Sequence, residues 1–162
     1  MPISAYLAGL REHIGHDLVL SPAVAAIIRD EAGRVLVHQR SDNGVWEVPA
    51  GAVDPGEAPA QALVREVFEE TGLKVVPLRV VAVVGGHALT HPNGDRTEPT
   101  GILFECSVVG GRLEARDGEA LAFRYDDPAR MPEHNIFPRH VFAPDFNGTY
   151  FAWDERWLVG LE

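Results

Sequence analysis

The chain lacks most of the features that mark secreted, membrane-bound and nucleic-acid-binding proteins. Cys106 is its only cysteine, so no intrachain disulfide bond can form, and this favours a reducing compartment. Asp and Glu outnumber Lys and Arg by 24 to 14, and the net charge of −10 argues against binding nucleic acid through a basic surface. The N-terminus lacks the basic start and apolar core of a signal peptide, and no apolar run approaches the roughly 18 residues of a membrane span. We therefore predict a cytoplasmic protein with no membrane segment and no nucleic-acid partner.

The rest of the composition is typical of a globular protein. Hydrophobic residues make up 46% of the 162 residues and charged residues 23%, which is enough for one domain with a core. No internal repeat or low-complexity linker divides the chain. We therefore expect a single domain over residues 1–162, with an N-terminal helical extension over 1–20 and a C-terminal tail over 133–162. The tail is rich in aromatic residues, for which core packing is the first interpretation and stacking on a nucleotide base the alternative.

Hydrophobic periodicity predicts strands on both sides of one central helix. Pro59 suits the first turn of that helix, and Gly72 suits the left-handed cap after its last turn. Strands are predicted over residues 23–29, 34–40, 101–109 and 120–125, with a short extended segment over 46–49. Residues 73–84 form a long apolar segment that Pro77 breaks. The polar insert 87–100 is predicted to be a surface hairpin, and a lip over the substrate is the alternative. Together these elements indicate an α+β fold, with a mixed sheet covered by helices.

Three carboxylates crowd into five residues of the central helix. Glu66 and Glu70 are four residues apart and therefore share a helix face, with Glu69 beside them. Like charges at this spacing repel by a few tenths of a kcal/mol. A hard divalent cation bound by their oxygens would turn that repulsion into attraction. The pattern thus predicts a magnesium-dependent enzyme that acts on phosphates.

The segment that contains these carboxylates resembles the Nudix box. That pattern is Gly, any five residues, Glu, any seven, then Arg-Glu, an apolar residue, any residue, Glu-Glu, any residue, Gly and an apolar residue. The residues that fill its specified positions are Gly51, Glu57, Arg65, Glu66, Val67, Glu69, Glu70, Gly72 and Leu73. Residues 24–51 and 118–132 are also similar to the family, whereas the tail from residue 133 is not.

The resemblance implies a Nudix hydrolase with an α/β/α sandwich fold and a mixed β-sheet. Such enzymes use Mg²⁺ or Mn²⁺ to cleave the diphosphate linkage of a nucleoside diphosphate joined to another group. It implies that Glu66 and Glu70 are the principal metal ligands and that Glu69 is a further ligand, directly or through water. The backbone carbonyl of Ala50 is expected to complete the inner shell. A metal held this way neutralises phosphate charge and activates a water for attack at phosphorus.

Other box residues are expected to support the carboxylates. Arg65 lies four residues before Glu69, so an ion pair between them would hold the catalytic row in register. A surface pair worth only about 0.3–0.5 kcal/mol is the alternative. Glu57 is expected to tether the loop to the helix. Gly51 and Gly72 are expected to have a structural role, because glycine allows backbone conformations and close approaches that other residues do not.

Two residues outside the box are further site candidates. By its position in the loop before the last predicted strand, Glu119 is the candidate general base, and a solvated turn carboxylate is the alternative. Arg40 stands where the family often binds phosphate, and its planar fork suits that ligand, with a solvated strand end as the alternative.

The sequence favours one substrate class slightly. Ala50 and Gly51 follow proline, and this Pro-Ala-Gly version is common among ADP-ribose pyrophosphatases, so a nucleotide sugar such as ADP-ribose is slightly favoured. The proline that those enzymes carry about fifteen residues past the box is absent, since Pro92 lies several residues late. The alternatives are a nucleoside triphosphate pyrophosphohydrolase and a non-catalytic nucleotide-binding module. A homodimer is the commonest assembly and is expected if the chain associates.

Overall fold

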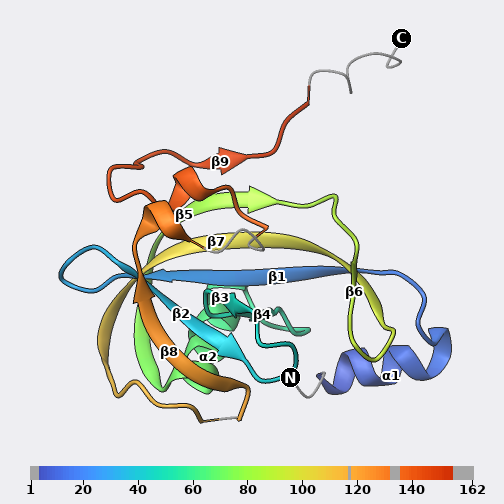
Figure 1. Ribbon diagram of the computed structural model, residues 1–162. Coiled ribbons are helices and arrows are strands. Elements are labelled where there is room, and N and C mark those ends of the chain that lie inside the picture. Colours follow the sequence, from blue (N-terminus) through green and yellow to red (C-terminus); the bar gives the residue numbers. More distant parts are fainter. Residues whose placement is uncertain (1–3, 117, 132–135, 155–162) are drawn as a thin grey trace.

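The part of the chain that the structure describes folds into two β-sheets packed with two α-helices and two short 3-10 helices (Figure 1). The structure, a computed structural model, describes residues 4–116, 118–131 and 136–154. The helices are α1 (Ala5–Ile14), α2 (Pro59–Thr71), η1 (Pro128–Arg130) and η2 (Arg139–Phe142). The larger sheet contains β1 (Val19–Ile28), β4 (Ala50–Ala52), β5 (Leu73–Val84), β6 (Leu89–Thr90), β7 (Arg96–Gly111) and β9 (Tyr150–Phe151). The smaller sheet contains β2 (Val35–Arg40), β3 (Trp46–Glu47) and β8 (Ala120–Asp126).

The larger sheet is mixed. Its strand order is β4-β1-β7-β5-β9, and β6 pairs with β7 as a side branch. β1 runs parallel to β7 and antiparallel to β4, while β5 runs antiparallel to β7 and parallel to β9. The prediction of an α+β fold with a mixed sheet is confirmed.

Each face of the larger sheet is covered by a helical layer, and β1 shows why. Ala25 and Ile27 of β1 point into the core that contains residues of η2, and Val24, Ala26 and Ile28 point into the core under α2. Because both faces are buried, the second half of β1 reads as a continuous apolar run rather than an alternating one. Figure 1 shows α2 below β1, and the orange segment that carries η1 and η2 on the other side of β1, beside β5. The face opposite α2 is thus covered in part by 3-10 turns.

The central helix begins and ends as predicted. Pro59 occupies the first helical position, and the N–H of Ala58 donates to Oε1 of Gln61 at 2.9 Å. Gly72 follows the last turn with a φ of 71°, and its N–H donates to the Phe68 carbonyl at 2.9 Å. A Cβ at Gly72 would lie 2.5 Å from the Arg112 carbonyl oxygen, so this position has room only for glycine.

Two strands are longer than predicted because they pair with each other. β1 begins at Val19 and β7 at Arg96, and the parallel register joins Val19 to Thr97 at the start of both. This first half of β1 is partly exposed and contains Ser21 and Pro22, so its apolar pattern is weak. The backbone of the partner strand stabilises it instead.

The polar insert is a hairpin, as its first interpretation predicted. Leu89 of β6 pairs with Thr97 of β7, and residues 91–95 form the turn between them. Asp95 contacts the N-terminal extension, since its Oδ1 lies 2.7 Å from Nδ1 of His16 and 3.5 Å from Nε of Arg11. The hairpin therefore packs against the end of α1.

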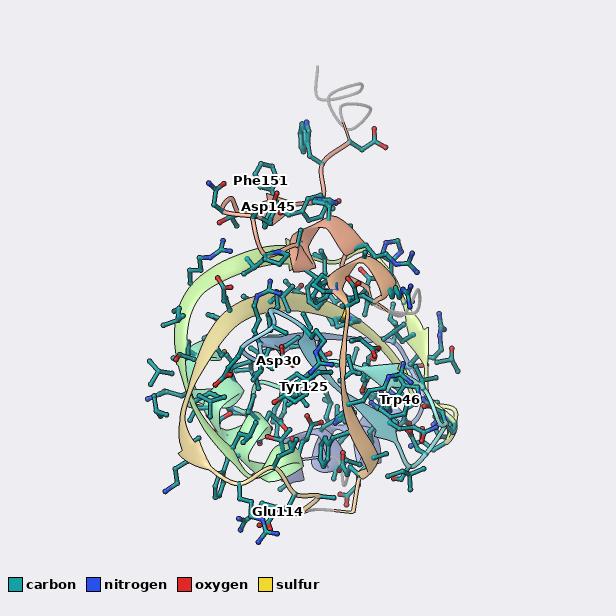
Figure 2. The ribbon with its side chains drawn as sticks, turned by 60° about the vertical axis from the view of Figure 1, so that its left-hand side comes forward. Asp30, Trp46, Glu114, Tyr125, Asp145 and Phe151 are labelled. Atoms are coloured by element: carbon teal, nitrogen blue, oxygen red, sulfur yellow. The ribbon has the colours of Figure 1, made fainter. Side chains whose placement is uncertain are left out.

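The aromatic residues of the tail divide into two groups. Phe137 and Phe142 are 5% and 0% exposed, so the core-packing interpretation is confirmed for them. Phe151 and Trp153 are 66% and 62% exposed, and Figure 2 shows Phe151 pointing outward from the C-terminal segment. Trp157, which the tail prediction included, lies outside the described residues.

Across residues 4–116, 118–131 and 136–154, no helix has the length and apolar character needed to cross a bilayer.

Candidate active site

The candidate site forms where α2 passes the short strand β4. A Cβ added to Gly51 of β4 would lie only 2.0 Å from Cδ of Glu66 and within 2.4 Å of both its oxygens. The missing side chain of Gly51 therefore makes the space that the Glu66 carboxylate occupies. Glu66 and Glu70 are 4% and 3% exposed, which is rare for glutamates without a full set of partners. The shared helix face predicted for these two residues is thus turned inward.

The second buried carboxylate is held by the backbone of β4. The N–H of Ala50 donates to Oε2 of Glu70 at 3.0 Å. Ala50 also lies opposite Ala25 in the pairing of β4 with β1, so the larger sheet fixes the position of this peptide. The structure therefore brings Ala50, Gly51, Glu66 and Glu70 together at one end of α2.

The guanidinium of Arg65 links the loop, β4 and the helix. Its Nε and Nη2 donate to the two oxygens of Glu57 at 2.8 and 2.9 Å, and Nη2 also donates to the Ala52 carbonyl at 3.1 Å. Its Nη1 lies 2.9 Å from Oε1 of Glu66 and 3.2 Å from Oε2 of Glu69. The expected contact with Glu69 is present, but the bidentate bond to Glu57 is closer. This bond from Arg65 lowers the pKa of Glu57 to about 2.

Burial shifts the pKa of both inward carboxylates upward. Burial raises the pKa of Glu66 to about 7, although the neighbouring Arg65 opposes the shift. Burial also raises the pKa of Glu70 well above its usual value, against the hydrogen bond from Ala50. The negative charges of Glu66 and Glu119 raise the pKa of Glu70 further. The charge of Arg65 thus offsets the effect of burial on Glu66 only in part, and a further cation would stabilise both carboxylates in their ionised form.

The donor set fits a hard divalent cation that keeps part of its water shell. In the ranges that the structure describes, no three His, Cys, Asp or Glu side chains are gathered into a ready-made metal cage. Mg²⁺ does not require such a cage, because it is usually bound by one or two carboxylates, waters and substrate phosphates. Glu66 and Glu70 supply those carboxylates, and the exposed Glu69, with 51% of its side chain accessible, stands beside them.

A small polar cavity adjoins Glu70. Its lining residues are His38, Arg40, Ser41, Asp42, Glu70 and Glu119. Its volume of about 10 Å³ is close to the space of one water molecule. The N–H of Ser41 donates to the Glu119 carbonyl at 2.7 Å, which ties together the two loops that carry the lining residues. The structure thus brings Arg40 and Glu119, two candidates from outside the box, next to a box carboxylate.

Arg40 is held on both sides by carboxylates. Its Nε and Nη2 donate to the two oxygens of Asp42 at 2.8 and 2.6 Å, and its Nη1 donates to Oε1 of Glu47 at 2.8 Å. The hydrogen bonds to Asp42, together with the charge of Glu47, outweigh burial and raise the pKa of Arg40 above its usual value. Arg40 therefore forms ion pairs with two carboxylates at the end of β2.

Two residues of this region, His38 and Glu47, were not predicted from the sequence. His38 is 1% exposed, its Nε2 lies 3.6 Å from Oε1 of Glu47, and its Nδ1 lies 3.9 Å from Oε2 of Glu70. Both ring nitrogens are buried without a hydrogen-bond partner, which costs about 1–3 kcal/mol for each polar group. The alternation of β2 was the available signal, because it places His38 on the same face as Arg40.

Comparisons with known proteins show the family of the chain. A sequence model described as NUDIX domain matches residues 19–146. A MutT-like protein of Streptomyces ambofaciens is 33% identical over 113 residues, which cover 70% of this chain and 68% of the relative. A putative 8-oxo-dGTP diphosphatase of Bacillus subtilis (strain 168) is 31% identical over 124 residues, which cover 76% of this chain and 78% of the relative.

A solved structure shares the fold. The crystal structure of an ADP-ribose pyrophosphatase from Streptococcus suis 89-1591 matches with a TM-score of 0.63 and 24% identity, over 82% of this chain and 98% of that chain. At this identity the likeness shows the fold alone. The family match covers most of the chain, and the resemblance read from the box is confirmed. The chain therefore belongs to the NUDIX domain family, and it is a Nudix hydrolase, an enzyme that acts on pyrophosphate bonds.

Proposed function

We propose that this enzyme hydrolyses the diphosphate linkage of a nucleoside diphosphate joined to another group, with Mg²⁺ or Mn²⁺ as its cofactor. The observation that supports it best is the pair of carboxylates on α2, Glu66 and Glu70, which are buried on one helix face and whose pKa values burial raises. Such a pair is costly unless a cation completes it. The substrate is a small molecule, and its phosphates would supply further oxygen ligands.

The proposed ligands are the carboxylates of Glu66 and Glu70 and the carbonyl of Ala50. Glu69 is proposed as a further ligand, directly or through water. When bound, the divalent cation neutralises charge on the phosphates and activates water for attack at phosphorus. Arg65 holds this row in place, because one guanidinium contacts Glu66, Glu69 and the loop residue Glu57.

Glu119 and Arg40 are proposed to act on the water and on the substrate. Glu119 lines the cavity beside Glu70, and we propose that its carboxylate accepts the proton of the attacking water. Nε and Nη2 of the Arg40 guanidinium bind the two oxygens of the Asp42 carboxylate. A phosphate has a similar pair of oxygens and could accept the same two hydrogen bonds. We propose that substrate phosphate displaces Asp42 from this guanidinium.

Two substrate classes are proposed, in order. A nucleotide sugar such as ADP-ribose is favoured by the Pro-Ala-Gly sequence that ends at Gly51. A nucleoside triphosphate is the second candidate, favoured by the similarity to a putative 8-oxo-dGTP diphosphatase over 76% of this chain. Phosphate release separates them, if it is coupled to alkaline phosphatase for nucleotide sugars and to inorganic pyrophosphatase for triphosphates, and is run with Mg²⁺ and then Mn²⁺.

The decisive variant is Glu70→Gln, which keeps the shape of the side chain and removes its charge. We expect kcat to fall by orders of magnitude on the best substrate while the fold is retained. Glu12→Gln, at an exposed glutamate of α1, is the matched control and should leave kcat unchanged. Full activity of the Glu70 variant would refute the metal assignment. Binding of a nucleotide sugar by folded wild-type protein, without turnover in either metal, would favour the non-catalytic module.

The assembly is tested separately. We propose that residues 1–162 form one domain and that the chain associates as a homodimer, if it associates at all. Light scattering on the full chain at several concentrations gives its mass in solution, which should correspond to one or two times 17.7 kDa.

A further inference from the structure

The geometry points to His38 as a positioning residue that orients the Glu70 carboxylate for metal binding. This inference rests on the proposed function, since it gives His38 a role toward a proposed metal ligand. His38 lies in β2, outside the box, and neither the box nor the family match assigns it a role. The argument depends on where the ring is buried, which oxygen it faces and which atoms surround it.

The ring of His38 is enclosed between two carboxylates from different elements. β2 pairs with β3 so that His38 and Glu47 are direct neighbours in the ladder, and α2 brings Glu70 to the opposite side of the ring. The side chain is 1% exposed, so water from the bulk cannot satisfy its nitrogens. A polar ring is not needed to fill this space, because an aromatic hydrocarbon ring would pack there without unpaired nitrogens. The position of its nitrogens therefore points to a polar task.

The ring faces one particular oxygen of Glu70. Nδ1 of His38 lies 3.9 Å from Oε2, the same oxygen that accepts the N–H of Ala50 at 3.0 Å. Two groups from two strands thus converge on Oε2. Together they would define the plane of the carboxylate without using Oε1. A ligand oxygen whose carboxylate is fixed in this way needs no reordering when the cation binds, which strengthens binding.

The other nitrogen faces a carboxylate that already has a cation. Nε2 of His38 lies 3.6 Å from Oε1 of Glu47, and that oxygen accepts Nη1 of Arg40 at 2.8 Å. A neutral imidazole has one N–H to donate. Glu47 has a charged donor in Arg40, whereas Oε2 of Glu70 has only the backbone N–H of Ala50, so the proposal places the N–H of the ring on Nδ1, which faces Glu70. The distance of 3.9 Å closes to a hydrogen bond with a movement of about 1 Å.

Three substitutions of His38 separate positioning from packing. His38→Phe keeps the ring volume and removes both nitrogens. His38→Asn places an amide N–H near the position of Nδ1, toward Glu70, and His38→Gln places one near Nε2, toward Glu47. Mn²⁺ binding to the full chain is measured from the decrease of the electron paramagnetic resonance signal of free Mn²⁺. His140→Phe is the matched control, because His140 lies on η2 and contacts Phe146 and Tyr150 in the tail.

We expect His38→Phe to weaken Mn²⁺ binding about 10- to 100-fold, the usual effect of losing the partner of a metal ligand. His38→Asn should recover most of that affinity, whereas His38→Gln should not. At saturating metal the KM for substrate should be unchanged in all three, because the ring is 1% exposed and its proposed role acts through Glu70. If circular dichroism shows that His38→Phe does not fold, the Mn²⁺ affinities of His38→Asn and His38→Gln are compared with each other and decide the test.

The possible results distinguish this inference from the proposed function. Wild-type protein that binds no Mn²⁺ would refute the proposed metal site and the role of His38 with it. Wild-type binding with unchanged affinity in the Phe variant would refute the role of His38 and leave the metal site intact. Equal losses in the Asn and Gln variants would also overturn the inference, because they would show that only the shape of the ring matters.

Discussion

Replacing Gly51 by alanine tests the contact between β4 and α2 on which the candidate site depends. The added Cβ would lie 2.0 Å from Cδ of Glu66, whereas ordinary van der Waals contact begins at 3.4 Å, so the carboxyl must retreat by about 1.4 Å. The carboxyl is 4% exposed, and Oε1 is held by Nη1 of Arg65 at 2.9 Å, so its retreat breaks or bends an ion pair. A misplacement of about 1 Å in an active site can cost on the order of 100-fold in rate.

We therefore expect Gly51→Ala to lower kcat about 100-fold and to weaken Mn²⁺ binding. Overpacking should also lower the free energy of unfolding by about 1–3 kcal/mol. Steady-state kinetics on the best substrate, Mn²⁺ titration and denaturant unfolding measure the three effects. Gly9→Ala is the control, because a Cβ there meets nothing within 4 Å and alanine stabilises a helix interior. Wild-type kcat and metal affinity in Gly51→Ala would refute the argument that Glu66 must occupy this space.

Two further predictions concern the charges around the site. Since burial raises the pKa of Glu66 from 4.5 to about 7, the metal-free native state binds more protons than the unfolded chain between these values. Its free energy of unfolding should therefore fall as the pH rises from about 5 to about 7, and this slope should be smaller in Glu66→Gln. Denaturant titrations in which the free energy of unfolding rises over this range would contradict the prediction. Asp42→Asn should lower the KM for substrate by up to about fivefold, because an exposed pair with Arg40 is worth about 0.2–1 kcal/mol. An unchanged KM in initial-rate measurements would show that Asp42 does not compete with substrate.

The elements predicted most accurately are those whose ends depend on neighbouring residues. The predicted helix coincides with α2, from Pro59 to the cap at Gly72, because a helix is closed by groups within four residues of each other. Local pattern is sufficient for such a segment. The apolar segment over residues 73–84 was predicted to be broken at Pro77, but β5 (Leu73–Val84) continues across it, and Pro77 falls at an irregularity in the pairing with β7.

Strand segments supported by distant partners were not predictable in the same way. The first half of β1 and the start of β7 have weak apolar patterns, yet their backbones pair over residues 19–28 and 97–106. β9 is a strand of two residues, Tyr150 and Phe151, and it exists only because it lies along β5. A β-ladder joins residues far apart in sequence, so its extent is determined by the partner strand as much as by the segment itself.

The candidate site likewise has features that one segment determines and features that depend on distant segments. The spacing of Glu66 and Glu70 alone determined that the two carboxylates share a helix face, because four residues make about one helical turn. Only the tertiary structure turned that face inward, placed Gly51 against Glu66, and brought His38 from a separate sheet to Glu70. It also decided that Arg40 is held by Asp42 and Glu47. The physical reason is that side-chain periodicity is a property of one segment, whereas burial, pairing and pKa shifts arise where segments from different parts of the chain meet.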